Sequence, residues 1–204
     1  MTFKRNKIIF LSMVIYVLIV MPKVFANNSP QNQLKESFDN LLIILKNPNF
    51  KKDENKEKRR QALSHAIFSK FNFEKMSQLC LGRHWKTKSK EEKKEFINLF
   101  RQLLEITYIS KIEGYTDEKI VVVKEMIRKK RAQVNTELIT QTMKIPINYR
   151  LYKSLNDTWL IYDVIVEGVS LVGNYRSQFS QILQKRKKNS FEKLLKNIKS
   201  KIEN

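Results

Sequence analysis

The stretch TWLIYDVIVEGVSLVGNYRSQF, residues 158–179, contains a strand, a tight turn and the beginning of a helix. Residues 158–167 are rich in β-branched and aromatic side chains, which is typical of a strand. Gly168 marks the turn, and Ser170 can cap a following helix. With regular alternation both faces of the strand are apolar, so we expect the sheet to be covered on both sides. One face would carry Trp159, Ile161 and Ile165, and the other Leu160, Tyr162, Val164 and Val166.

Three further strand-like segments precede this one, at residues 119–128, 132–140 and 144–153. The breaks between them are too short to hold crossover helices. The pattern therefore predicts an antiparallel four-stranded sheet in which each strand pairs with the next.

Helical spacing of apolar residues dominates the rest of the chain. It predicts helices within residues 34–45, 62–67 and 73–81, a long helix that ends at Gly114, and two helices after Ser170. Ser89 and Glu92 form a capping box at the start of the long helix. With no internal repeat or linker, residues 27–204 are expected to form a single α+β domain.

The N-terminus has the pattern of a secretory signal peptide. Basic Lys4, Arg5 and Lys7 precede the apolar segment 8–20, and Val24-Phe25-Ala26 offers a cleavage site after Ala26. The alternative is an uncleaved anchor, but the apolar segment is shorter than the ~20 residues that span a bilayer. We expect export, and a mature protein without a disulfide because Cys80 is the chain's single cysteine.

The charge is strongly positive, at +20 for the whole chain and +16 for residues 27–204. Such an excess indicates a polyanionic partner: nucleic acid, an anionic membrane surface or phosphate headgroups. A drift in base composition also explains it, because the basic residues are dispersed. A nucleic-acid surface would interleave aromatic and basic residues, whereas here the aromatics follow the periodicity of the interior. No nucleic-acid partner is expected.

Residues for catalysis are scarce, since the chain has two histidines, one cysteine and four glycines. A zinc site needs more sulfur or imidazole ligands. Cys80 lies on the apolar face of a short helix, where an inert buried thiol is more common than a Cys80–His84 pair. Gly168–Gly173 lacks the spacing of a nucleophile elbow, and no histidine follows it. We expect no catalytic residues, no metal and no cofactor.

Two segments resemble the signatures of the MlaC (toluene-tolerance) family of phospholipid-binding proteins. They are residues 71–85, FNFEKMSQLCLGRHW, and residues 162–179, YDVIVEGVSLVGNYRSQF. Between them, IPINYRL at 145–151 resembles the family's third strand. Cys80 departs from the small residue expected there, which is a conservative change.

The resemblance implies a curved sheet and helices around an internal apolar cavity that holds phospholipid acyl chains. It implies a soluble periplasmic carrier between an outer-membrane lipoprotein complex and an inner-membrane ATP-binding-cassette complex with an MCE-type subunit, in the Mla lipid-asymmetry pathway. The alternatives are an exported basic adaptor or chaperone without a ligand and, less favoured, a secreted nucleic-acid-binding protein. On this reading the acyl chains contact Leu103, Tyr108, Val122, Leu138, Tyr149, Leu151, Tyr162, Val164, Val166 and Val172, and the headgroup meets Arg150, Asn174 and Arg176.

Overall fold

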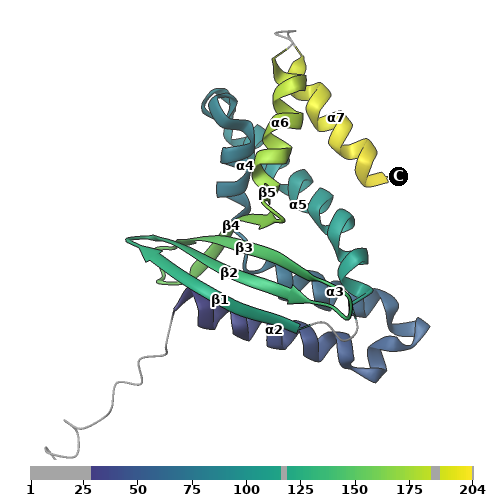
Figure 1. Ribbon diagram of the computed structural model, residues 1–204. Helices are drawn as coiled ribbons and strands as arrows, with labels where there is room; N and C mark the ends of the chain where they lie inside the picture. Colours follow the sequence, from purple (N-terminus) through teal and green to yellow (C-terminus); the bar gives the residue numbers. More distant parts are fainter. Residues whose placement is uncertain (1–28, 116–118, 185–188, 204) are drawn as a thin grey trace, which may run out of the picture.

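The computed structural model describes residues 29–115, 119–184 and 189–203 (Figure 1). In this part of the chain an open, antiparallel five-stranded sheet in the order β1-β2-β3-β4-β5 packs with six α-helices, so the α+β class is confirmed. The expected signal peptide, residues 1–26, lies outside the described residues. None of the helices in the described segments is long and apolar enough to cross a membrane.

The helices lie before and after the sheet in the chain, as the periodicity predicted. Short 3-10 turns at Pro48–Lys51, Asp53–Asn55 and Gly82–Thr87 connect some of them. The helices are α2 (Pro30–Lys46), α3 (Lys56–Phe68), α4 (Phe73–Leu81), α5 (Lys90–Glu113), α6 (Leu171–Leu183) and α7 (Ser190–Glu203). The strands are β1 (Lys119–Arg128), β2 (Arg131–Ile139), β3 (Lys144–Lys153), β4 (Trp159–Val166) and β5 (Val169–Ser170).

Helix ends are set by the capping residues that the sequence indicated. At the start of α5 the Glu92 amide donates to Ser89 Oγ at 3.1 Å, and the Ser89 amide donates to the Glu92 carboxylate at 2.8 Å. The capping box is therefore confirmed, and so is Ser170, whose hydroxyl accepts from the Gly173 amide at 2.9 Å. Gly114 follows the last residue of α5 as expected.

The sheet has a fifth strand that was not expected. Glu167 and Gly168 have left-handed φ angles of 50° and 82°, and they reverse the chain after β4. The next two residues, Val169 and Ser170, then pair back onto β4. A two-residue strand carries no alternation pattern, so the sequence could not indicate it.

A β-bulge at Tyr162 changes which residues of β4 share a face. Arg150 of β3 pairs with Asp163, but the next residue, Leu151, pairs with Ile161, so Tyr162 has no partner of its own. An extra residue inverts the alternation. Trp159, Ile161, Val164 and Val166 therefore lie on one face, and the assumption of regular alternation was wrong. A second bulge, at Val123 in β1, has the same effect on that strand.

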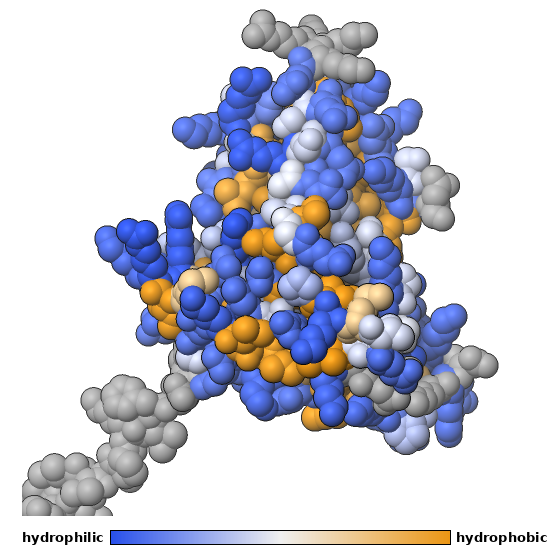
Figure 2. All heavy atoms as spheres, in the orientation of Figure 1, coloured by the Kyte–Doolittle hydropathy of each residue, from blue (hydrophilic) through white to orange (hydrophobic). Residues whose placement is uncertain are grey.

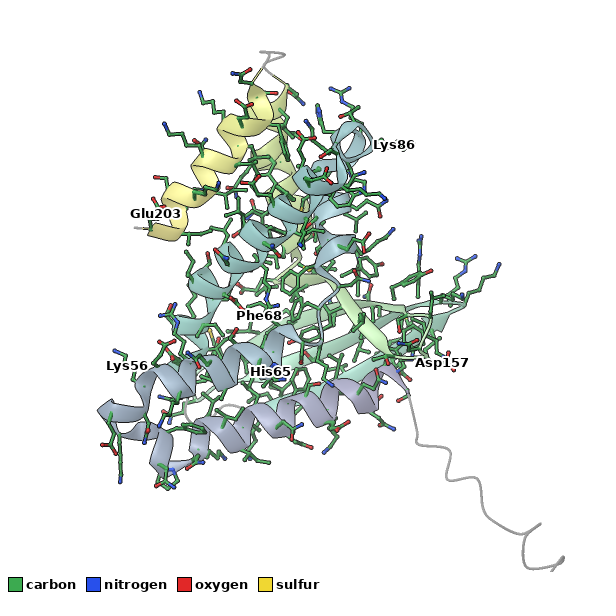
Figure 3. The ribbon with its side chains drawn as sticks, turned by 180° about the vertical axis from the view of Figure 1, so that it is seen from behind. Lys56, His65, Phe68, Lys86, Asp157 and Glu203 are labelled. Carbon is green, nitrogen blue, oxygen red and sulfur yellow. The ribbon has the colours of Figure 1, made fainter. Side chains whose placement is uncertain are left out.

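We call the face of the sheet toward α2 the inner face. Figure 3, seen from behind, shows α2 and α3 in front of the sheet, whereas Figure 1 shows the opposite, outer face. The register places mainly polar residues on the outer face, so the expectation that both faces need an apolar cover was wrong for most of the sheet. These residues are Gln133, Asn135, Glu137, Asn148 and Arg150.

The interior has two apolar clusters. The larger one is formed mainly by helices α3 to α7, with Leu45 at the end of α2, and includes Phe96, Phe100 and Leu104, each at most 1% exposed. The smaller one lies between α2 and the inner face of the sheet, where Leu34 contacts residues of β2, β3 and β4. Phe71 packs against both clusters, so it joins the helical core to the sheet.

Candidate functional site

The inner face of the sheet is apolar yet only partly closed. Val122, Tyr149 and Val164 pack against the α2–sheet cluster and remain partly accessible, although they point toward α2. In a filled core such side chains are fully enclosed by neighbours. The accessible apolar area on an inward face is the property that an alkyl-chain site requires.

Six of the ten predicted chain-contact residues lie together on this inner face. Cross-strand pairing joins Val122, Leu138, Tyr149, Leu151, Val164 and Val166 through β1, β2, β3 and β4. Leu138 and Leu151 are buried, whereas Val166, close to the end of β4, is 40% exposed. The bulge at Tyr162 is what brings Trp159 and Ile161 to the same side.

The other four predicted residues belong to the helical cluster. Leu103 and Val172 are buried in it, and Tyr108 and Tyr162 pack against it. Tyr108 and Tyr175 form a side-chain hydrogen bond, and burial raises the pKa of Tyr175 to about 12. The structure therefore divides the predicted set between two neighbouring clusters.

Aromatic residues connect these two clusters. The phenols of Tyr115, after α5, and Tyr149, on β3, are close enough that Tyr115 adds to the effect of burial in raising the pKa of Tyr149. Phe38 of α2 lies 5.6 Å from the Tyr149 ring, centroid to centroid. Phe71 and Tyr115 belong to this aromatic connection, but the sequence analysis did not predict them as site residues. Their partners are distant in the sequence and follow no local pattern.

Asp163 is a buried polar centre that the sequence analysis also missed. It is 3% exposed on the outer face, beneath the start of α6. Its carboxylate accepts hydrogen bonds from Ser170 Oγ at 2.8 Å, from the Val172 amide at 3.1 Å and from Arg150 Nη1 at 3.2 Å. A single carboxylate therefore holds β3, β4 and the first turn of α6 together.

Of the three predicted headgroup residues, Arg150 contacts this centre, whereas Asn174 and Arg176 lie on α6. Arg150 is engaged with Asp163, and it points away from the inner face. Asn174 accepts a hydrogen bond from Gln178 at 3.3 Å. The guanidinium of Arg176 lies over Gly82, which has a left-handed φ of 54°. All three side chains are exposed, but Arg150 and the inner apolar residues lie on opposite faces of the sheet.

A separate cleft of about 320 Å³ lies between α3 and α5 and reaches Ile202 of α7. Eight of its eleven lining residues are polar or charged, and none belongs to the ten predicted chain-contact residues. Within it, Glu105 accepts hydrogen bonds from Ser64 and from Arg101, the latter at 3.3 Å. The cleft is therefore distinct from the predicted chain-contact set.

The chemistry of Cys80 and His84 does not suit nucleophilic catalysis. Cys80 is 1% exposed, its thiol donates to the Val172 carbonyl at 3.7 Å, and burial raises its pKa, with a further contribution from Asp163. Partial burial and the neighbouring Arg83 and Lys88 lower the pKa of His84. In the described segments no three His, Cys, Asp or Glu side chains gather as a metal site would need. The expected burial of the Cys80 thiol is confirmed.

Comparison with solved structures shows that the fold is shared with a known structure. The chain is similar to the phospholipid-binding protein from Ralstonia solanacearum, solved in complex with a phospholipid, with a TM-score of 0.75 and 22% sequence identity. The match covers 84% of this chain and 96% of the other. At this identity the likeness shows a shared fold.

Sequence comparison gives the family. The chain is 23% identical over 180 residues to the intermembrane phospholipid transport system binding protein MlaC of Haemophilus influenzae, covering 86% of this chain and 84% of that protein. The sequence model of the MlaC protein family matches residues 35–200. This protein belongs to the MlaC family, a family of lipid-binding transport proteins and not of enzymes.

Proposed function

We propose that this protein is a soluble periplasmic carrier that binds phospholipid and moves it between membrane-bound complexes. The observation that carries the proposal is the inner face of the sheet, where apolar side chains directed toward α2 remain partly accessible. Family membership supports the same ligand class.

The physical need for such a site follows from the hydrophobic effect. Each methylene exposed to water costs about 0.8 kcal/mol, so a lipid with ~30 methylenes faces a cost on the order of 20 kcal/mol on leaving a bilayer. An apolar pocket offsets most of this cost. The carrier needs no nucleotide or metal for this step, and its partners determine the direction.

In the proposed complex the acyl chains lie along the inner face and contact Val122, Tyr149 and Val164. The chains then continue past Phe71, which packs against both clusters, toward Tyr108 and Tyr162, which pack against the helical cluster. Asn174 and Arg176 are exposed donors for a phosphate. Arg150 fits this role less well, since it is bonded to Asp163 and lies on the outer face.

The proposal includes the protein's route and partners. We infer that residues 1–26 are removed after Ala26 and that residues 27–204 form one lipid-binding domain in the periplasm. The proposed partners are an outer-membrane lipoprotein complex and an inner-membrane ATP-binding-cassette complex with an MCE-type subunit. The signal-like N-terminus and the family membership support this assignment.

Extraction of the purified protein with organic solvent tests the proposal. We expect phospholipid in the extract in an amount comparable to the protein, since the ligand has no easy exit into water. A denatured and refolded sample, freed of lipid, should take it up again from vesicles. An extract without phospholipid, together with no uptake, contradicts the carrier function and favours an adaptor without a ligand.

A further inference from the structure

One end of the sheet carries four consecutive basic residues that the proposed lipid site does not use. Arg128, Lys129, Lys130 and Arg131 form the turn between β1 and β2, and all four are exposed. No ion pair involves them within the described residues. The end of the sheet therefore carries a concentrated positive charge that the protein itself does not neutralise.

The β3–β4 turn lies directly beside these basic residues. The Lys153 amide donates to the Lys130 carbonyl at 2.9 Å, which joins the two turns. Leu155, in the second turn, is 96% exposed, and Ile127 and Met126 at the end of β1 are 52% and 41% exposed. We call these seven residues the sheet tip: Met126, Ile127, Arg128, Lys129, Lys130, Arg131 and Leu155.

The sheet tip projects away from the helices. Figure 1 shows the β1 arrow ending beyond them, and Figure 2 shows hydrophilic side chains standing out there beside hydrophobic ones. In Figure 3 the labelled Asp157, in the same turn as Leu155, lies at the opposite side from Lys56 and Glu203. The tip therefore extends past the first turn of α2, whose Gln31 amide donates to Glu125 of β1 at 2.7 Å.

The backbone of both turns is in a conformation that favours glycine or asparagine. Lys129 has a φ of 55° and Asp157 a φ of 59°. A left-handed backbone conformation at a non-glycine residue costs about 1 kcal/mol of folding free energy. Lys129 therefore destabilises its turn while it adds positive charge. The only acidic group of the tip turns, Asp157, is paired with Lys153 at 3.0 Å.

We propose that the sheet tip docks the protein on an anionic phospholipid bilayer. The four basic side chains match the negative charge of the lipid phosphates, and Leu155 and Ile127 match the apolar layer beneath the headgroups. This combination of cationic rim and exposed apolar side chains fits a membrane surface. The proposal extends the proposed carrier function, because a docked carrier is held where its lipid is exchanged.

The test is flotation with vesicles of phosphatidylcholine alone or mixed with phosphatidylglycerol. A basic residue close to an anionic surface contributes about fivefold in affinity. The tip variant Arg128→Gln/Lys129→Asn/Lys130→Gln/Arg131→Gln should therefore bind the mixed vesicles roughly 600-fold more weakly. Raising the ionic strength from ~0.1 M to ~1 M, which shortens the screening length from about 10 Å to about 3 Å, should release the wild-type protein.

A matched control removes the same charge elsewhere. Lys90→Gln/Lys193→Gln/Lys196→Gln/Lys201→Gln alters exposed lysines of α5 and α7, and it should bind the mixed vesicles nearly as the wild type does. Leu155→Asn keeps the net charge and suits the turn, and it should weaken binding severalfold. This single change also tests the proposal if the fourfold variant does not fold.

Several results would overturn the docking proposal. One is that the tip variant floats with the mixed vesicles as well as the wild type does. Another is that the tip variant and the lysine control lose the same share of vesicle binding. A third is that the wild-type protein binds equally to vesicles with and without phosphatidylglycerol. The lipid extracted from the tip variant distinguishes the two proposals. Bound lipid with unaltered vesicle binding rejects docking alone, whereas tip-dependent docking without extractable lipid rejects the carrier function alone.

Discussion

Replacement of Asp163 by alanine should destabilise the protein far more than an ordinary surface change. The carboxylate is 3% exposed and accepts three hydrogen bonds, from Ser170, Val172 and Arg150. Loss of the acceptor leaves the buried Val172 amide without a partner, which costs about 1–3 kcal/mol. Arg150 is 44% exposed, so its ion pair adds less than ~1 kcal/mol. The total loss of unfolding free energy is roughly 3 kcal/mol, whereas the whole unfolding free energy of a typical domain is ~5–15 kcal/mol.

Urea denaturation followed by circular dichroism measures this change in the free energy of unfolding. Asp163→Asn keeps the size of the side chain and one acceptor oxygen, so it should lower the unfolding free energy by about half as much as Asp163→Ala. The control Asp39→Ala breaks an exposed pair with Lys35 and should change stability by less than ~0.5 kcal/mol. A loss below ~1 kcal/mol for Asp163→Ala, with an unchanged dependence on urea, would refute the assignment of Asp163 as the centre that fixes α6 to the sheet.

Two further predictions concern the buried titratable groups. The Cys80 thiol, with its raised pKa, should resist a thiol-specific reagent at pH 8 in the native protein and react fully in denaturant; labelling of native protein at the rate of a free cysteine would contradict this. Burial raises the pKa of Tyr175 to about 12, so its contribution to stability is complete below pH 10 and is lost as the pH rises toward 12. Tyr175→Phe should therefore lose less of its unfolding free energy than the wild type does between pH 10 and pH 12. The same pH dependence in the variant and the wild type would contradict this role of Tyr175.

Local signals in the sequence predicted most of the elements. The capping box of Ser89 and Glu92, the cap at Ser170 and the end of α5 at Gly114 depend on neighbours within a few residues, and the structure has all of them. The order of the four long strands followed from the shortness of the breaks. These features need no knowledge of distant contacts.

The faces of the sheet could not be predicted because they depend on bulges. A bulge is a property of the pairing between two strands, and the residues around Tyr162, apolar except for Asp163, give no local sign of it. The role of Asp163 as a buried hydrogen-bond acceptor could not be predicted for the same reason. The hydrogen-bond partners of this single acidic residue, Arg150 and the first turn of α6, are distant in the local pattern, and only the fold brings them near it.

The proposed carrier function depends most on the inner face of the sheet holding the acyl chains. Native mass spectrometry of Val164→Trp, compared with the control Val121→Trp, tests it directly. Val164 points toward α2, whereas Val121 is 44% exposed on the outer face opposite Glu137. We predict that the tryptophan at 164 removes most of the bound phospholipid from a folded protein, and that the tryptophan at 121 leaves it unchanged. Equal lipid content in the two variants would contradict the claim.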